Sequence, residues 1–257
     1  MIYVTGSSGF VGKHLLKALK GDVICIPHEK ISSFVFEPFD QFYFLSSYGN
    51  LFSQEDDAKI WQANIIDLIS ILEKISAINF KSFLFISTSS VKLQYQTMYS
   101  RAKKAAEEIL LSYVEKYHLP ISIIRPYSIT GIGEQSQHLI PTLIRSCFTG
   151  ELVNFVPDVV HDWIDVDDVV AAMVNLSQKS AHGVFEVGNG KKYTNQQVLE
   201  TVERITKKKV KINVVERLRD YDNAEWFSTN FRSRMYGWLP KKSLEQSISE
   251  MVNAYER

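Results

Sequence analysis

A glycine-rich stretch, Thr5-Gly6-Ser7-Ser8-Gly9-Phe10-Val11-Gly12, follows the apolar run Ile2-Tyr3-Val4 and precedes a predicted helix over residues 13–19. A strand, a turn and a helix in this order need glycine for a tight turn, for close approach of the backbone to a pyrophosphate, and for close helix packing. The N–H groups and positive dipole end of the helix then face the anion. A turn that is glycine-rich for packing alone is the alternative. We predict a dinucleotide-binding loop with contacts at Gly6, Ser8, Gly9, Phe10, Val11 and Gly12.

Short apolar runs recur along the first half of the chain and alternate with longer amphipathic segments. The runs are residues 2–4, 23–26, 41–45, 82–87 and 121–124. This alternation predicts an α/β fold of the Rossmann type, a doubly wound parallel sheet covered by helices on both faces. Helices are predicted over 60–75 and 99–117. Beyond residue 131 the alternation weakens. We therefore expect one unit over 1–257, with a dinucleotide-binding core in 1–130 and about 161–178, and a small C-terminal substrate-binding lobe from parts of 131–160 and 180–257.

The composition of the 257-residue chain restricts the class of partner. Its 29 Lys and Arg residues balance 29 Asp and Glu residues, so no net field attracts nucleic acid or an anionic membrane. Cys25 and Cys147 stand far apart in apolar stretches, which resembles neither a disulfide framework nor a metal-binding cluster. The first residues lack the features of a signal peptide. We expect a cytoplasmic protein that binds no metal.

The residues after the second predicted strand bear on cofactor choice. The strand runs out into Pro27-His28-Glu29-Lys30. An acidic residue here accepts hydrogen bonds from the adenosine ribose of NAD, a role open to Glu29. His28 and Lys30 would instead suit the 2′-phosphate of NADP, and all three residues could equally be solvated. The sequence leans slightly toward NADPH.

Tyr99 has a lysine, Lys103, four residues later on a predicted helix, which places both side chains on one helical face. Lowering the tyrosine pKa by about three units requires roughly 4 kcal/mol, and an ammonium about 4 Å away provides on the order of that. A hydroxyl cluster, residues 87–90, ends the fourth predicted strand, where doubly wound sheets place their ligands. Tyr99 and Lys103 thus form a candidate proton-transfer pair, although such a pair taken alone is more often a surface feature.

At this point the chain resembles the extended short-chain dehydrogenase/reductases, the NAD-dependent epimerase/dehydratase family that acts on nucleotide sugars. The glycine loop matches the family, as do Tyr99 and Lys103, and Thr88 aligns with its catalytic Ser or Thr. The resemblance implies catalysis by Thr88, Tyr99 and Lys103. Beyond the glycine loop, His28 and Lys30, it implies cofactor contacts from the catalytic tyrosine and lysine and from Leu45, Ser46, Ser47, Asn64, Pro126 and Ile129.

Departures from the family pattern narrow the reaction that the resemblance implies. Dehydratases and decarboxylases place acidic residues after the catalytic hydroxyl, where this chain has Ser89 and Ser90. In members that epimerise a sugar before reducing it, a cysteine stands at Ser90 and a histidine at His138, of which this chain keeps the histidine. His161 replaces a common arginine. The implied substrate contacts are Ser89, Ser90, Ser128, His138, His161 and Arg217. Arg217 and Asp220 match the Arg and Asp of a later substrate-binding segment of the family. His138 and Arg217 could equally be surface residues.

The resulting hypothesis is an NAD(P)-dependent oxidoreductase that reduces the 4-keto group of a nucleotide-diphosphate sugar. A C4 epimerase with retained NAD would use the same residues. A dinucleotide-sensing module without turnover is the third reading, disfavoured by the intact Thr88, Tyr99 and Lys103. The resemblance also implies a homodimer through the helices over 60–75 and 99–117.

Overall fold

The computed structural model describes residues 1–51, 53–216 and 226–256. Its contacts divide the chain into two compact units. The first comprises residues 1–126, 170–186 and 231–238, and the second comprises 127–169, 187–230 and 239–257. The first unit therefore takes 180–186 and 231–238 from the expected lobe, and 183–187 forms a strand beside the fifth strand of the sheet. The second unit takes 127–130 and 161–169 from the expected core.

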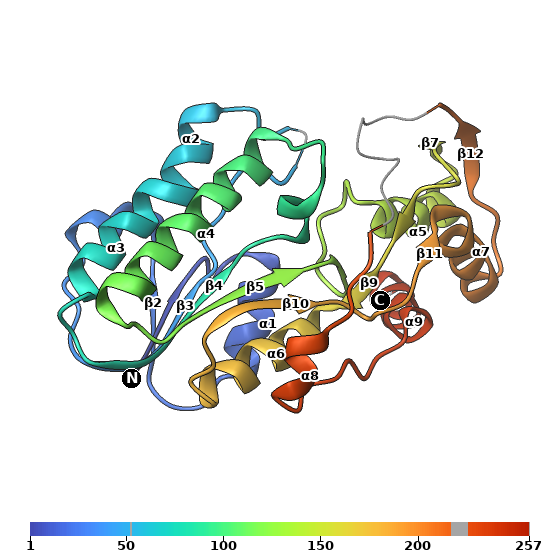
Figure 1. Cartoon of the computed structure of the whole chain (residues 1–257). Coiled ribbons are helices and arrows are strands. Elements are labelled where there is room, and N and C mark those ends of the chain that lie inside the picture. The colour runs from blue at the N-terminus through green and yellow to red at the C-terminus, as the bar shows by residue number, and fades with distance from the viewer. Residues whose placement is uncertain (52, 217–225, 257) are drawn as a thin grey trace. The chain divides into compact units, whose positions relative to one another are not determined.

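The first unit contains a six-stranded sheet in the order β10-β5-β4-β3-β1-β2 (Figure 1). Its strands are β1 (Ile2–Thr5), β2 (Val23–Ile26), β3 (Phe39–Phe44), β4 (Phe80–Ile86), β5 (Ile121–Pro126) and β10 (Gly183–Val187). All five predicted strands are confirmed, and the pairs among them are parallel. The carboxyl ends of β1, β3 and β4 therefore lie at one edge of the sheet, where ligands of such folds bind.

Helices follow the strands as the alternation predicts. The first unit holds α1 (Phe10–Ala18), α2 (Asp57–Trp61), α3 (Asp67–Ile75), α4 (Met98–Tyr117), α8 (Phe231–Met235) and most of α6 (Val166–Gln178). A π-helical turn, η2 (Gln62–Ile66), joins α2 to α3, and 3₁₀ turns form at η1 (His28–Ser33) and η3 (Ser89–Lys92). Thr97 caps α4 by accepting a 3.2 Å hydrogen bond from Ser100 N, so the helix starts at Met98, one residue before Tyr99.

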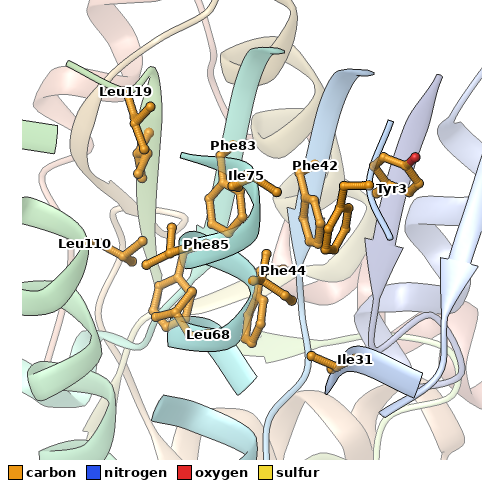
Figure 2. Close-up of a cluster of buried hydrophobic side chains, with 14 of the residues drawn as sticks. Tyr3, Ile31, Phe42, Phe44, Leu68, Ile75, Phe83, Phe85, Leu110 and Leu119 are labelled. Carbon is orange, nitrogen blue, oxygen red and sulfur yellow. The ribbon is translucent and has the colours of Figure 1, made fainter. Parts of the chain in front are cut away.

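One face of the sheet is a row of large side chains in register. Tyr3 pairs with Phe42, Phe42 with Phe83, and Phe83 with Ile121. The rings of Phe42 and Phe83 stack with centroids 4.9 Å apart. Leu68, Ile75 and Leu110 of α3 and α4 cover this row in Figure 2, where the side chains share one buried cluster. Because side chains alternate along a strand, every second residue of β3 and β4 is committed to this core.

The opposite face of the sheet carries α6. Ser82 of β4, which alternates with Phe83, lies with its Oγ 2.7 Å from Oγ of Ser177 on α6. Both hydroxyls are buried and each satisfies the other. Helices therefore cover both faces, which makes the sheet doubly wound, as predicted.

The second unit is built from helices and short strand pairs. Its helices are α5 (Leu139–Thr149), α7 (Asn195–Thr206) and α9 (Leu244–Tyr255). Its strands pair as β6 (Ser128–Thr130) with β9 (Trp163–Asp165), β7 (Leu152–Phe155) with β12 (Lys211–Val214), and β8 (Val160–His161) with β11 (Tyr193–Thr194). A separate cluster that includes Leu143, Val198 and Ile248 forms its core. Among the described residues, no helix combines the length and apolar character needed to cross a membrane.

Candidate active site

Two glycines of the loop between β1 and α1 are required by the fold itself. Gly6 has a φ of 67°, and a Cβ there would stand 2.6 Å from the backbone carbon of Leu45. A Cβ on Gly12 would stand 2.2 Å from the carbonyl oxygen of Gly6. Both contacts are with backbone, which cannot move aside as a side chain can. The loop is thus folded tightly on the segment after β3.

Gly9 differs from its two neighbours, because it is exposed and has an ordinary φ of −74°. A Cβ there would meet Gly6 O at 3.3 Å, a much milder contact than at the other two positions. The packing of the chain itself therefore tolerates a side chain at Gly9 better than at Gly6 or Gly12. An exposed glycine at a strand-to-helix turn leaves room for a ligand to approach the backbone.

The N-terminus of α1 is suited to an anion. Gly9 is its N-cap and provides no side-chain hydrogen bond, and no acidic residue stands in the first turn. The first backbone N–H groups of a helix have no partner within the helix and carry a partial positive charge. Exposed Ser8 and half-buried Phe10 and Val11 flank this helix start. These residues fit the pyrophosphate of a dinucleotide, as the sequence predicts.

The charged residues that follow β2 are not all simply solvated. Nδ1 of His28 lies 2.6 Å from Oδ2 of Asp67 on α3, whose carboxylate is buried. Gln62 Nε2 donates to the other carboxylate oxygen at 2.8 Å. Lys30 and Glu29 lie exposed on η1. His28 is thus tied to α3, while Lys30 extends from the turn after β2.

The segment after β3 joins the glycine loop to the helical turn that carries Asn64. Leu45 N and Ser46 N donate to Thr5 Oγ1 at 3.2 and 3.3 Å. Ser47 Oγ donates to Asn64 Oδ1 at 3.1 Å. The Asn64 amide in turn donates at 2.8 Å to the carbonyl oxygens of residues 48 and 60. The sequence analysis missed Thr5, whose position at the end of β1 was the available signal.

Gly49, a second residue that the sequence analysis missed, brings this segment against the candidate catalytic tyrosine. It has a φ of 106°, and a Cβ there would lie 3.3 Å from the Cβ of Tyr99 and 2.8 Å from a side-chain atom of Ile60. A larger residue would push the segment away from Tyr99. A glycine inside a loop carries little signal in a single sequence.

Thr88 lies two residues after the end of β4 and is the N-cap of η3. Its Oγ1 accepts from Ser90 N at 3.2 Å and lies 3.0 Å from Ser90 Oγ. Thr88 and Ser90 are partly exposed, whereas Ser89 is 1% exposed. The hydroxyls of Thr88 and Ser90 therefore stand together at the carboxyl end of the sheet, and Ser89 is part of the interior.

Tyr99 and Lys103 lie one turn apart on α4, with the Lys103 Nζ 6.0 Å from the centre of the Tyr99 ring. Lys103 is fully buried, donates to the carbonyl oxygen of Ile86 at 3.0 Å, and lies 4.6 Å above the Phe85 ring. Burial lowers the pKa of Lys103 to about 7, against the attraction of Glu107. Burial raises the pKa of Tyr99, and contact with the Ser47 hydroxyl opposes the rise. The expected lowering by Lys103 does not dominate, because burial of the Tyr99 hydroxyl has the largest effect on its pKa.

The remaining residues predicted to contact cofactor or substrate are divided between the two units. Pro126 ends β5 in the first unit. In the second unit, Ile129 lies on β6, and Ser128 Oγ lies 3.3 Å from Nδ1 of His161. His138 starts α5, with its Nδ1 3.1 Å from Oε1 of the buried Glu134. Arg217 and Asp220 lie outside the described residues.

Comparison with known proteins agrees with this fold. Residues 2–188 match the model of the NAD dependent epimerase/dehydratase family. GDP-6-deoxy-D-mannose reductase of Pseudomonas aeruginosa is 24% identical over 298 aligned positions, which cover 99% of this chain and 97% of that protein.

Solved structures show the same fold over nearly the whole chain. The structure of RMD from Pseudomonas aeruginosa complexed with NADPH has a TM-score of 0.86 at 22% identity, covering 99% of this chain and 98% of that one. UDP-glucose 4-epimerase of Thermus thermophilus in complex with NAD has a TM-score of 0.87 at 19% identity, with the same two coverages, 99% and 98%. The family match spans the glycine loop, Thr88, Tyr99 and Lys103. This chain belongs to the NAD dependent epimerase/dehydratase family.

Proposed function

We propose that this protein reduces the 4-keto group of a nucleotide-diphosphate sugar with an NAD(P)H cofactor. The observation that carries the proposal is the convergence, in one compact unit, of the glycine loop, Thr88, Tyr99 and Lys103. The 24% identical relative, named a GDP-6-deoxy-D-mannose reductase, supports this type of substrate. Ser89 and Ser90 after Thr88 supply no acidic group, which disfavours elimination of water.

The side chains then have separate roles. Thr88 donates a hydrogen bond to the substrate carbonyl oxygen, and Tyr99 gives that oxygen its proton as the carbonyl becomes a hydroxyl. Lys103, held by the Ile86 carbonyl, stabilises the tyrosinate that remains. A bound nicotinamide supplies the hydride for the carbonyl carbon. Ser128, His138 and His161, which belong to the second unit, stay predicted substrate contacts.

Epimerisation at C4 is the second candidate, because an NAD-bound UDP-glucose 4-epimerase shares the fold with a TM-score of 0.87. The two reactions differ in what happens to the cofactor. A reductase consumes one NAD(P)H for each turnover, so absorbance at 340 nm falls when a 4-keto nucleotide sugar is added. An epimerase keeps its NAD and interconverts 4-hydroxy sugars with no net absorbance change. Interconversion without consumption of NAD(P)H would replace the reductase proposal.

We predict a moderate preference for NADPH, carried by Lys30. Exposed Lys30 follows β2, where the adenosine ribose of a dinucleotide lies in such folds, whereas His28 is paired with Asp67. A lysine–phosphate contact of this exposure contributes on the order of 1 to 2 kcal/mol, so NADPH should bind about ten-fold more tightly than NADH. The preference should weaken as salt rises.

Fluorescence titration of both dinucleotides tests this prediction. Lys30→Ala should lower the affinity for NADPH and leave that for NADH nearly unchanged. The neighbouring Glu29→Gln, which tests the alternative ribose contact, should leave the affinity for NADPH nearly unchanged. Equal losses for both dinucleotides would make Lys30 a structural residue of the turn. A strong preference of the wild type for NADH would instead assign the ribose contact to Glu29.

We also propose that two copies pair through the outer faces of the helical segment 57–75 and α4. Ile66 is 50% exposed there, and Ile109 and Tyr113 are only partly buried. Ile66→Glu should convert a dimer to monomers, because a carboxylate would be desolvated at the interface. Sedimentation velocity at micromolar concentration measures the change, and a wild-type monomer would contradict the proposal.

A further inference from the structure

A buried carboxylate stands one helical turn beyond Lys103 on α4. Glu107 is 2% exposed, and its position repeats the four-residue spacing from Tyr99 to Lys103. Side chains at this spacing lie next to one another on one helical face. Tyr99, Lys103 and Glu107 therefore form a line that runs from the candidate site into the protein.

Glu107 is held by partners from two strands. Arg125 of β5 donates from Nε to both carboxylate oxygens, at 3.0 and 3.1 Å, and from its NH2 group to Oε2. Ser87, at the end of β4, donates its hydroxyl to Oε1. A buried carboxylate with this many donors is held in one place. A carboxylate exposed at the surface would not need so complete a set of contacts.

A nearby negative charge would favour the ammonium form of Lys103, because the side chain is fully buried. Its Nζ contacts one carbonyl oxygen and the face of the Phe85 ring. Burial lowers the pKa of Lys103 to about 7, and Glu107 acts in the opposite direction. Without Glu107 the neutral amine would be favoured further.

The remaining charged groups of the elements packed on α4 do not take this role. They are Asp57, Lys59, Asp67, Glu73, Lys74, Lys92 and Arg125. Asp57, Lys59, Glu73 and Lys92 are exposed, and Asp67 pairs with His28. Lys74 donates to the carbonyl oxygens of residues 31, 32 and 34. Arg125 is a cation that binds Glu107 itself.

We propose that Glu107 is a positioning residue that keeps Lys103 in its ammonium form, with Ser87 and Arg125 holding the carboxylate in place for this purpose. The inference rests on the proposed function for its effect on turnover. Glu107 itself acts through Lys103 and takes no part in the transfer of the proton or hydride. Through Glu107, this network links the Tyr99–Lys103 pair on α4 to Ser87, which follows β4, and to Arg125 of β5.

The direct test measures the titration of Lys103 in the full chain, free of substrate and cofactor. NMR of protein labelled with ¹³Cε-lysine follows each ammonium, and Lys103→Arg identifies the signal. Glu107→Gln keeps the size of the side chain and removes its charge, so the pKa of Lys103 should fall by at least about one unit, a ten-fold change in the protonation equilibrium. Glu108→Gln, which removes an exposed charge from the same helix, should leave the titration unchanged.

Turnover gives a second readout. If the pKa falls from about 7 to about 6, Glu107→Gln should be about ten-fold slower than wild type at pH 8 but within about two-fold at pH 6. A uniform loss at both pH values would indicate a merely structural role and overturn the proposal.

Each remaining outcome has a defined meaning. A folded Glu107→Gln variant with the wild-type Lys103 titration would also overturn the proposal. If that variant does not fold, Glu107→Gln combined with Arg125→Gln removes both charges together. The titration of Lys103 should then be lowered by a smaller amount, because loss of the Arg125 cation acts in the opposite direction; an unchanged or raised titration there would reject the role as well. A lowered titration in a protein that turns over no nucleotide sugar would support the role of Glu107 and reject the proposed reaction instead.

Discussion

Tyr99→Phe should reduce turnover by roughly 10²–10⁴-fold, the usual contribution of a positioned general acid. Phenylalanine keeps the Cβ beside Gly49 and the ring, and removes only the hydroxyl, whose proton the carbonyl oxygen needs. Lys103 contacts Ile86 O and the Phe85 ring, so it should stay in place when the hydroxyl is lost. Cofactor affinity should therefore remain close to that of the wild type.

Steady-state rates and a fluorescence titration of NADPH separate these two effects. Tyr95→Phe is the matched control, because Tyr95 is 56% exposed and lies before α4. It should retain wild-type turnover. If Tyr99→Phe kept more than a few per cent of the wild-type rate, the proton would have to come from another group, and Thr88 with Ser90 would be the next candidates.

Regular periodicity made the sheet predictable. The predicted strands are short apolar runs, most of them with Phe or Ile at alternate positions, as in Phe42 and Phe44 of β3. Such a run has few alternatives to a buried strand. The glycine loop was predictable for a related reason. A Cβ at Gly6 or Gly12 would lie closer to backbone atoms than a side chain tolerates, so the fold requires glycine at both positions. Local sequence determines both features directly.

Contacts between segments distant in sequence were much less predictable. The four-residue spacing indicated that Tyr99 and Lys103 share a face, but nothing local indicated that Lys103 would be fully buried against β4. Burial controls its pKa more than the neighbouring tyrosine does. The pairing of His28 with Asp67 joins residues 39 positions apart and has no local signature. The second unit lacks regular periodicity, so its strand pairs were not foreseen.

Substitutions at two glycines three residues apart, Gly9 and Gly12, should separate the effect of the loop on dinucleotide binding from its effect on folding. Gly9→Val should lower dinucleotide affinity on the order of a hundred-fold while the protein stays folded. Gly9 is exposed and has an ordinary extended conformation, so valine costs about 1 kcal/mol of stability as a poorer N-cap. Its side chain would nevertheless stand where the pyrophosphate approaches the start of α1.

Gly12→Ala is the contrasting variant, because its Cβ would lie 2.2 Å from Gly6 O and 2.8 Å from the Cα of Ser7. Relief of such contacts requires movement of the backbone, so we expect the free energy of unfolding to fall by roughly 2 kcal/mol or more. Urea denaturation measures this loss for both variants, and fluorescence titration measures the affinity for NADPH and NADH. Wild-type affinity in a folded Gly9→Val protein would show that the pyrophosphate does not lie against the start of α1. A Gly12→Ala protein of unchanged stability would show that the loop is looser than its backbone contacts imply.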